Sequence, residues 1–458
     1  MKKSALSIGL IAILGGAWCG GAWYTGKIAE QKYIDYIQLS NQQLQQSLAD
    51  SGYSVQIKDA VLDRGFFSSD MHYQIEIKGY NLDEVIPFVG KIYHGPITLN
   101  NFSFALFSAD TEVEKTQATQ AYFADNGKNP LRTITTMSYG QELKGKVYSD
   151  VAHKTADQVD VSWNLDGKFD VDQQGYGKSE IDISKFSLIG SNKARVILEN
   201  AKGKGNILPT QWDNIYQGDS DISIGKISAY DAKNELTIIL DNVGIENKID
   251  TKDGFIDMDF DYTAKNIIIN NHPVTGFKLK GTLSHILGDA VNRLNEIDEY
   301  DLNSDKIFHQ IQQEILANQP VLDIDKLELF NDKGKALEGE AKIALSKVFQ
   351  TSLKNEKIFD AFDTFKINAE SEKKALVQLV KNLFATNPRT QQISEQEVEN
   401  TVQQYLEEIA KNNFIMLKDN KANFKVFLDK DKQKLIFNNK EMSEMDIGIA
   451  MMLLMMAH

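Results

Sequence analysis

The chain has 458 residues and a formal net charge of −14 at pH 7. This length is enough for a large hydrophobic core or for several domains. The acidic surplus excludes a nucleic-acid partner, which would require a basic face. The single cysteine, Cys19, excludes a disulfide within the chain.

An uncharged apolar stretch at residues 4–26 follows a short basic tail at residues 1–3. About 20 apolar residues span a bilayer as a helix, and Trp18, Trp23 and Tyr24 suit the membrane–water boundary. The stretch predicts a single transmembrane anchor, and the two lysines of the tail favour a cytoplasmic N-terminus. We therefore expect a single-pass inner-membrane protein with most of its chain in the periplasm.

Two other interpretations of this stretch stay open. A secretory signal also has a basic start and an apolar middle, and it would be cleaved ahead of Trp23. Acylation of Cys19 would make the chain a lipoprotein, although Trp18 is bulkier than the residues that normally precede such a cysteine.

Residues 27–52 are expected to form a membrane-proximal helix. Ile34, Ile37, Leu44 and Leu48 recur at helical spacing on one side of it. Such a helix either packs on the following domain or pairs with a second copy of the chain, so a homo-oligomer is one hypothesis for its partner.

Residues 53–283 are expected to form one large antiparallel β region. Apolar and polar residues alternate there with a period of two, which is typical of strands with one buried face. The alternation is clearest in the segments 71–78, 159–165, 222–227, 236–240 and 256–262. Short turns separate the segments, which indicates a meander of antiparallel neighbours.

Residues 284–446 are expected to mix helices and strands. Helical spacing occurs at 284–300, 304–318, 373–384 and 395–412, and strand patterns occur at 321–330, 336–345, 414–418, 421–428 and 434–438. Ser394 and Glu397 have the spacing of a capping box. The predicted fold class is therefore α+β, mostly an antiparallel β meander with inserted helices, preceded by one transmembrane helix.

The C-terminal tail at residues 447–458 is apolar and rich in methionine. It is too short to span a bilayer. We expect it to dock on the protein's own sheet, and contact with a partner or a membrane is the alternative.

The sequence contains no recognised catalytic or phosphate-binding motif, and no two histidines have metal-ligand spacing. We therefore predict a protein that is not an enzyme, with no catalytic, cofactor-binding or metal-binding residues and no cofactor.

Two local features invite a functional interpretation at residues 64–107. His94-Gly95-Pro96 could supply a base or a metal ligand, but Gly-Pro more simply forms a turn into a strand at 97–107. Arg64, beside Gly65, is most simply explained by a salt bridge in a turn.

A row of alternate aspartates, Asp257, Asp259 and Asp261, suggests a calcium site. Neighbours on one face of a strand are about 6.6 Å apart, which is too wide for one coordination shell. The row is therefore interpreted as a solvent-exposed sheet face.

Several segments resemble the YdgA-like family of Gram-negative bacteria. They are the N-terminal stretch that ends in Trp23-Tyr24-Thr25-Gly26-Lys27, the run Arg64-Gly65-Phe66-Phe67-Ser68-Ser69, the triplet His94-Gly95-Pro96, and Leu435-Ile436-Phe437-Asn438-Asn439-Lys440. The chain has Asn439-Lys440 where the family often has Asn-Gly, so its last turn departs from the pattern.

This resemblance implies an inner-membrane-anchored periplasmic protein of the cell envelope. A weaker likeness links the chain to AsmA-type proteins, which follow an N-terminal anchor with long β meanders that can curl into a lipid-holding groove. The leading hypothesis is a non-enzymatic protein that binds an envelope component or associates with itself. The alternatives are a lipid-handling protein of AsmA-like type and an envelope hydrolase with an unrecognised site.

Overall fold

The computed structural model describes part of the predicted membrane-proximal helix and most of the chain beyond it. The described residues are Ile37, Gln38, Asn41, Gln42, Leu44, Gln45, Leu48 and residues 52–442, except 66–67, 80–81, 95–96, 99, 124–126, 141, 156–157, 173, 213–214, 234, 296, 298–303, 356, 388 and 412. None of the helices in this part is long and apolar enough to span a bilayer. The predicted anchor at 4–26 and the tail at 447–458 lie outside it.

Internal contacts divide the chain into two compact units, which we describe one at a time. Unit 1 comprises residues 1–206 and 231–233, and unit 2 comprises residues 207–230 and 234–458. The division falls inside residues 53–283, which the sequence analysis treats as one β region.

Unit 1 is built almost entirely from strands. They are β1 (Ser54–Arg64), β2 (Ser68–Gly79), β3 (Leu82–His94), β4 (Ile97–Thr98), β5 (Ser103–Phe104), β6 (Phe107–Val113), β7 (Arg132–Met137), β8 (Leu143–Lys154), β9 (Asp160–Val171), β10 (Gly177–Ile189) and most of β11 (Arg195–Pro209), with one 3₁₀ turn, η1 (Thr119–Tyr122). Each strand from β1 to β3 and from β6 to β10 pairs antiparallel with the next. The predicted meander is confirmed in this unit.

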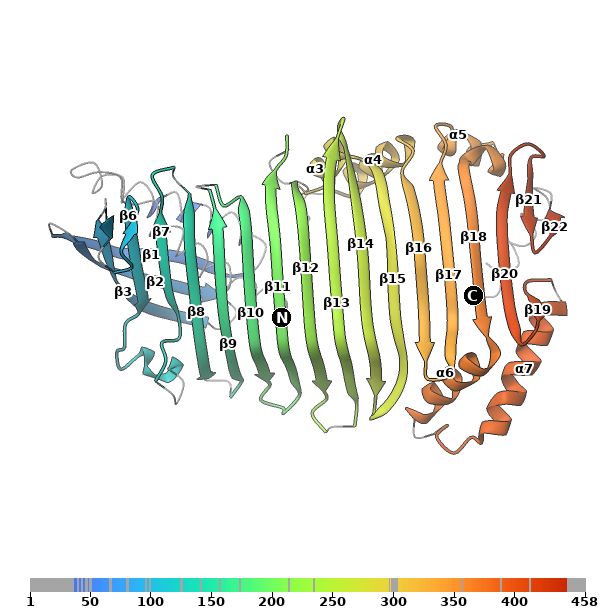
Figure 1. Ribbon diagram of the computed structural model, residues 1–458, viewed down its shortest axis with the longest axis horizontal. Coiled ribbons are helices and arrows are strands. Elements are labelled where there is room, and N and C mark those ends of the chain that lie inside the picture. Colours follow the sequence, from blue (N-terminus) through green and yellow to red (C-terminus); the bar gives the residue numbers. More distant parts are fainter. Residues whose placement is uncertain are drawn as a thin grey trace. The chain divides into compact units, whose positions relative to one another are not determined.

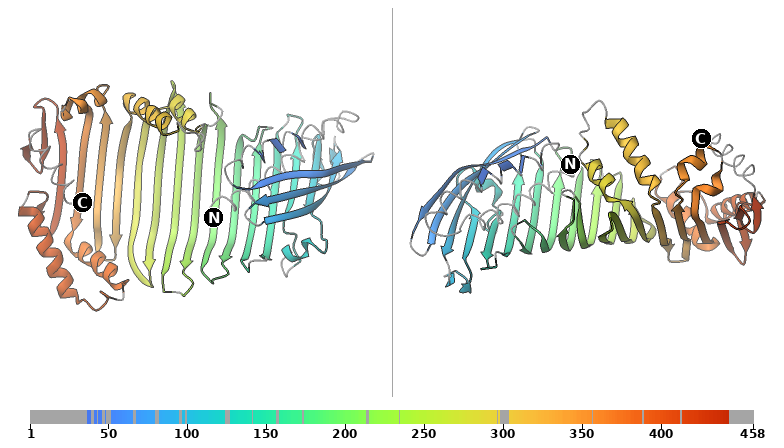
Figure 2. Two further views of the ribbon diagram at one scale, coloured as in Figure 1. Left: turned by 180° about the vertical axis from the view of Figure 1, so that it is seen from behind. Right: turned by 90° about the horizontal axis from the view of Figure 1, so that it is seen from above.

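The sheet of unit 1 bends over itself and encloses its own core. Strands β1–β3 run across β6–β9 in Figure 2, so that their apolar faces meet. Fully buried side chains such as Met71, Ile92 and Phe107 fill the space between them. Leu44 and Leu48, from the helical residues that precede β1, join the same cluster. These two side chains are therefore packed on the chain's own strands.

The Asn41 side chain hydrogen-bonds to the outer edge of β1. Within the described residues β1 pairs with β2 alone, and its free edge faces Asn41. The Asn41 amide donates to the Ile57 carbonyl oxygen at 3.0 Å and accepts from the Ile57 amide at 2.7 Å. This pair of hydrogen bonds replaces those of a neighbouring strand and fixes the preceding helix against the sheet.

The prediction of a single strand at 97–107 is wrong. The structure breaks it into the two-stranded hairpin β4–β5 and the separate strand β6. The reversal comes at Asn100–Phe102, where Phe102 has a φ of 52°. Thr98 and Asn101 hydrogen-bond across the reversal at 2.5 Å, which stabilises the turn.

Replacement of Gly145 by alanine is expected to destabilise unit 1. A Cβ at Gly145 would lie 2.1 Å from Cζ of Phe169, whose ring is buried in the core. The ring would have to move, at a cost of about 1–3 kcal/mol. Scanning fluorimetry of the detergent-extracted full-length protein should show a lower melting temperature.

Gly140→Ala is the matched control, because its Cβ would meet nothing closer than the Ser138 hydroxyl at 3.6 Å. Equal melting temperatures for Gly145→Ala and the parent protein would contradict the packing described for this core.

Unit 2 has one long sheet with helices placed near the ends of its strands (Figure 1). The strands are β12 (Tyr216–Tyr230), β13 (Thr237–Lys252), β14 (Phe255–Ile269), β15 (His272–Leu287), β16 (Val321–Asn331), β17 (Gly334–Leu345), β18 (Phe362–Glu372), β19 (Met416–Lys418), β20 (Lys421–Asp429), β21 (Lys434–Phe437) and β22 (Lys440–Met442). The helices are α3 (Gly288–Asn295), α4 (Ser304–Ala317), α5 (Phe349–Lys354), η2 (Ile358–Ala361), α6 (Lys373–Ala385) and α7 (Glu395–Lys411). All pairings from β12 to β18, and those among β18–β22, are antiparallel.

Most of the helices and hairpins expected after residue 300 are confirmed. Predicted helices at 304–318, 373–384 and 395–412 correspond to α4, α6 and α7. The capping box is also present, because the Ser394 amide donates to the Glu397 carboxylate at 2.9 Å and the Glu397 amide donates to the Ser394 hydroxyl at 3.3 Å.

The helix predicted at 284–300 begins too early. Residues up to Leu287 belong to β15, where Ile286 pairs with Ile256 and Leu287 with Phe255. Helix α3 starts at Gly288, on which the Trp212 ring is packed. Ile286 and Leu287 have helical spacing, but pairing with their cross-strand partners places them in the sheet.

One face of the unit 2 sheet, which we call the charged face, carries ion pairs between neighbouring strands. Examples are Lys366–Glu340 at 2.8 Å and Lys342–Asp323 at 2.5 Å. Most of these pairs are exposed, so each contributes little to stability. Glu328 is the buried exception and forms ion pairs with both Lys326 at 3.0 Å and Lys335 at 2.9 Å.

Acid should weaken unit 2 in part through Glu328. Burial raises the pKa of its carboxyl group, but hydrogen bonds from Lys335 and Lys326 outweigh burial and leave that pKa below its ordinary value of 4.5. The ionised form therefore stabilises the fold above pH 4.5, and this contribution is lost as the pH falls through the lowered pKa. Glu328→Gln should lower the melting temperature at neutral pH and flatten its decline on acidification.

Glu246→Gln, at an exposed position of β13, is the control for this measurement. A decline with pH in Glu328→Gln as steep as that of the parent would refute the contribution assigned to the ion pairs.

Candidate functional site

The other face of the unit 2 sheet is apolar, and we call it the apolar face. Residues that lie opposite each other in antiparallel strands share a face. Such pairs connect Ile245 with Tyr262, Tyr262 with Leu279 and Leu279 with Leu327. The same rows continue through Ile343, Phe365 and Ile367 on β17 and β18.

The apolar face runs from β12 to β18. Its members are Ile222, Ile224, Val243, Ile245, Ile249, Met258, Phe260, Tyr262, Phe277, Leu279, Leu283, Leu322, Ile324, Leu327, Leu329, Leu337, Ile343, Phe365 and Ile367. Every one of these side chains is partly or fully solvent-accessible, and Ile222 is 37% exposed. None reaches the burial typical of a core residue.

The two units differ in how far their apolar side chains are buried. The buried cluster of unit 1 draws on most strands of its curled sheet. Among the described residues of unit 2, the corresponding cluster is small and lies at α6 and α7: Val377, Val398, Val402, Leu406 and Ala422. Within the described residues, the middle of the long sheet therefore has an apolar surface without a covering core layer.

Helices border the apolar face near the ends of its strands. The Phe349 ring of α5 meets Phe362 at 5.9 Å between ring centroids, and Phe362 meets Phe365 at 5.2 Å. At the opposite ends of the strands, α6 contacts β15–β18. Viewed along the sheet in Figure 2, these helices project from one side of it. They leave a broad apolar strip between two rims.

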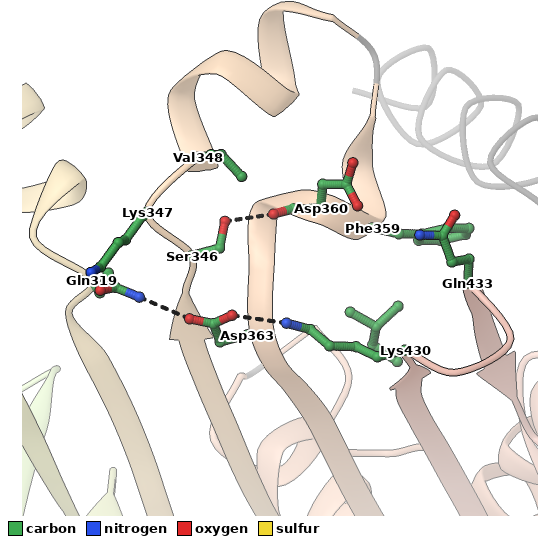
Figure 3. A pocket seen from close by; sticks show the side chains of 10 residues that line it. Gln319, Ser346, Lys347, Val348, Phe359, Asp360, Asp363, Lys430 and Gln433 are labelled. Atoms are coloured by element: carbon green, nitrogen blue, oxygen red, sulfur yellow. Dashed lines mark hydrogen bonds and ion pairs between the residues drawn. The ribbon is translucent and has the colours of Figure 1, made fainter.

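A cavity of about 400 Å³ lies at the α5 rim (Figure 3). Leu428 of β20 lines it and lies two residues beyond Val426, the partner of Ile367 on the apolar face. Asp363 accepts from Gln319 Nε2 at 2.9 Å and from Lys430 Nζ at 2.8 Å. The cavity thus has a polar wall and, at Leu428, borders one end of the apolar strip.

Two charged residues of this cavity, Lys347 and Asp360, are exposed to solvent. Lys347 and Asp360 both line it, and neither side chain forms an ion pair with another described residue. Ser346, between them in the wall, donates its hydroxyl to the Asp360 carbonyl oxygen at 2.5 Å. Among the residues that the structure describes, Lys347 and Asp360 are thus exposed charges of the cavity wall that form no ion pair.

His94 lies at the end of β3. Its Nε2 is 3.0 Å from the Ser69 hydroxyl, so the structure brings together the two family-like segments that contain these residues. Ser69 is completely buried, however, with 0% of its surface exposed. This pair connects β2 to β3, and the Ser69 hydroxyl is not accessible to a substrate.

The aspartate row on β14 is confirmed as a polar sheet face. Each carboxylate has its own partner on β15: Asp257 accepts from the His285 amide at 2.7 Å, Asp259 from Thr282 at 2.8 Å, and Asp261 pairs with a lysine at 3.5 Å. Within the described part of the chain, no group of three or more His, Cys, Asp or Glu residues is arranged to hold a metal ion.

Arg64 ends β1 and is exposed. The salt bridge expected for it is not formed with any described residue. Cys19 lies outside the described part, so the lipoprotein and signal-cleavage interpretations stay as predictions.

Comparison with known proteins places the chain in a family. Residues 1–445 match the model of the family described as bacterial protein of unknown function (DUF945), and the chain belongs to this family. Protein YdgA of Escherichia coli is 24% identical over 372 residues, which cover 76% of this chain and 72% of YdgA. The YdgA-like resemblance is confirmed.

A second relative is an uncharacterized protein of Haemophilus influenzae. It is 31% identical over 241 residues, which cover 49% of this chain and 65% of that protein. The match thus spans less than two-thirds of that relative's length. Neither relative nor the family description indicates an enzymatic activity.

Sequence reasoning found the strands of the site but not the site itself. Alternation along β14 indicates an apolar side and a charged side, yet it carries no information on what covers the apolar side. The cavity is built from the strand ends and loops of residues 319–433, which are far apart in sequence. No local motif marks it.

Proposed function

We propose that this chain is a non-enzymatic, membrane-anchored protein of the cell envelope that holds the acyl chains of a lipid on the apolar face of unit 2. The anchor would be residues 4–26, and most of the chain would lie in the periplasm. The likeness to AsmA-type proteins drawn from the sequence agrees with this choice, as an analogy.

The observation that supports the proposal is the apolar face, which no layer of described residues covers. Soluble proteins rarely leave large contiguous apolar patches in water, and such patches usually mark a binding surface. This one extends across β12–β18 and is bordered by helices near both ends of the strands. A long strip of this kind fits an extended chain better than a compact ligand.

An acyl chain would gain enough free energy there to bind. Burial of one methylene contributes about 0.8 kcal/mol, so ten methylenes against Phe260, Tyr262, Leu279 and their neighbours would contribute roughly 8 kcal/mol before the cost of association. The charged face opposite would keep the other side of the sheet in water.

Other functions have less support. Self-association through the membrane-proximal helix would need Leu44 and Leu48, which are 3% and 4% exposed in the core of unit 1. A hydrolase centred on His94 would need a reachable nucleophile, and its neighbour Ser69 is buried. A protein partner on the apolar face stays an outcome of the experiment below.

Photo-crosslinking at one pair of adjacent residues tests the proposal. Ile222 and Ser223 are neighbours on β12, both are exposed, and they lie on opposite faces of the sheet. With p-benzoyl-L-phenylalanine in place of Ile222, irradiation of membranes that contain the full-length protein should give phospholipid adducts, seen by mass spectrometry.

The same amino acid at Ser223 should give none, because that position belongs to the polar side. Protein adducts at position 222, or equal lipid labelling at 222 and 223, would count against a lipid-holding face.

The anchor is tested by extraction. The full-length protein should stay in the membrane pellet after treatment with alkaline carbonate, because about 20 apolar residues insert stably. Replacement of residues 4–26 by a cleavable secretory signal should move it to the soluble periplasmic fraction. Release of the unmodified protein by carbonate would overturn the predicted anchor.

A further inference from the structure

We propose that the hairpin β4–β5 of unit 1 inserts into the surface of the membrane that carries the predicted anchor. The inserted part is a group of three exposed aromatic residues, Phe102, Phe104 and Tyr139, which we call the aromatic tip. This inference rests on the proposed anchor at residues 4–26 and is independent of the apolar face of unit 2.

The side chains of the aromatic tip are largely exposed to water. Phe102 is 79% exposed and Phe104 is 76% exposed, the two highest values among the large apolar side chains of the described residues. Tyr139, from the turn between β7 and β8, is 48% exposed, and its ring centroid lies 4.8 Å from that of Phe104. Aromatic rings contribute strongly to binding when they are buried, so a group of exposed rings indicates a contact surface.

Hydrogen bonds hold the hairpin in place against the sheet. Thr98, at the base of the hairpin, is completely buried and donates its hydroxyl to Asn101 at 2.5 Å. The Asn101 amide donates to the Thr136 hydroxyl on β7 at 3.1 Å, and the Asn100 amide donates to the Ser108 hydroxyl on β6 at 2.9 Å. The exposed rings therefore belong to a hairpin that is fixed by its own polar side chains.

The backbone of Phe102 also argues that its ring has a use outside the fold. Its φ of 52° lies in the left-handed region, which is costly for a bulky side chain. Glycine adopts this region without that cost. Because the ring is exposed, packing within the described part of the protein does not explain a phenylalanine at this position.

The hairpin leaves the sheet at the end of unit 1 where β1 ends. His94 and Phe107, which flank the hairpin in sequence, pair with each other at the ends of β3 and β6. Arg64, the last residue of β1, pairs with Ser69, and the Ser69 hydroxyl lies 3.0 Å from His94 Nε2. The end of β1 and the base of the hairpin are therefore close together.

The segment that follows the predicted anchor is long enough to bring the membrane to this end of unit 1. Asn41 is hydrogen-bonded to Ile57, and Arg64 lies seven residues further along β1, or about 23 Å. Residues 27–41 connect the anchor to this point, and fifteen residues reach about 22 Å as a helix and at most about 50 Å when extended. The anchor can therefore end at the level of the aromatic tip.

A lipid surface is the partner that these observations favour. Phenylalanine and tyrosine rings settle at the boundary between acyl chains and headgroups. With the anchor in the bilayer, the tip searches for its partner at a high effective concentration. The net charge of −14 gives no general attraction to anionic lipids, so insertion of the rings must supply the contact.

Photo-crosslinking tests this contact in membranes that contain the full-length protein. With p-benzoyl-L-phenylalanine in place of Phe102, irradiation should give phospholipid adducts, detected by mass spectrometry. The adducts should persist at high salt concentration, because the contact is apolar.

Val85 is the matched control position, since it is apolar, 44% exposed and nine residues before His94 on β3, or about 30 Å away. The same amino acid there should give no lipid adducts. Equal lipid labelling at 85 and 102, no lipid adducts at 102, or protein adducts at 102 in their place would overturn the membrane contact.

Phe102→Gly separates a membrane role from a structural one. Because glycine suits the φ of this position, the melting temperature of the detergent-extracted full-length protein should stay the same or rise. In the same variant, p-benzoyl-L-phenylalanine at Tyr139 should lose most of its lipid labelling. A lower melting temperature would assign the ring to packing, and undiminished labelling at 139 would show that the tip does not carry the contact.

Comparison of positions 102 and 222 distinguishes failure of this inference from failure of the proposed function. Lipid adducts at 102 without adducts at 222 would support the membrane contact and reject the lipid-holding face. Adducts at 222 without adducts at 102 would reject the aromatic tip alone.

Discussion

Antiparallel pairing with strict alternation of side chains is the constraint on which the whole structure depends. Successive residues of a strand place their side chains on opposite faces, so the apolar face becomes larger with every strand that joins the sheet. Such a face is normally packed against another layer of the protein. Unit 1 solves this by bending β1–β3 over β6–β9, and its core is complete. Unit 2 extends its sheet strand by strand, and its described helices cover the apolar face near the strand ends. The difference in curvature, more than any difference in composition, separates a closed core from an open surface.

Polar interactions follow the same division of faces. Ion pairs such as Lys342–Asp323 connect neighbouring strands on the charged face, where water weakens them. They contribute solubility and correct register, because a slip by one residue would carry every charge to the apolar side. At the α5 rim the strands end, so side chains are no longer sorted onto two faces. Lys347, Asp360 and Asp363 line one cavity together with Leu428 there. Charged and apolar groups can meet there without a burial cost for an unpaired ion.

The sequence predicted the local pairing well and the long-range arrangement less well. Alternation in β2, β9 and β14 identified strands, and short turns implied antiparallel neighbours. The errors came where a local pattern has two physical solutions. Ile286 and Leu287 have helical spacing, yet pairing with Ile256 and Phe255 extends β15 through them. Residues 97–107 are apolar enough for a strand, but the reversal near Phe102 divides them. The cavity could not be predicted from the sequence, because its walls come from segments that only the folded sheet brings together.

The bridge between Asn41 and Ile57 bears on how the chain is made. Nearly every contact of the unit 2 sheet joins strands that are close in sequence, so each hairpin can form as soon as it emerges. The core of unit 1 instead includes side chains from Leu44 to Phe169. This core is therefore complete only after β9 has been synthesised. Closure of the unit 1 core thus requires more of the chain to be synthesised than formation of any single hairpin of unit 2 does.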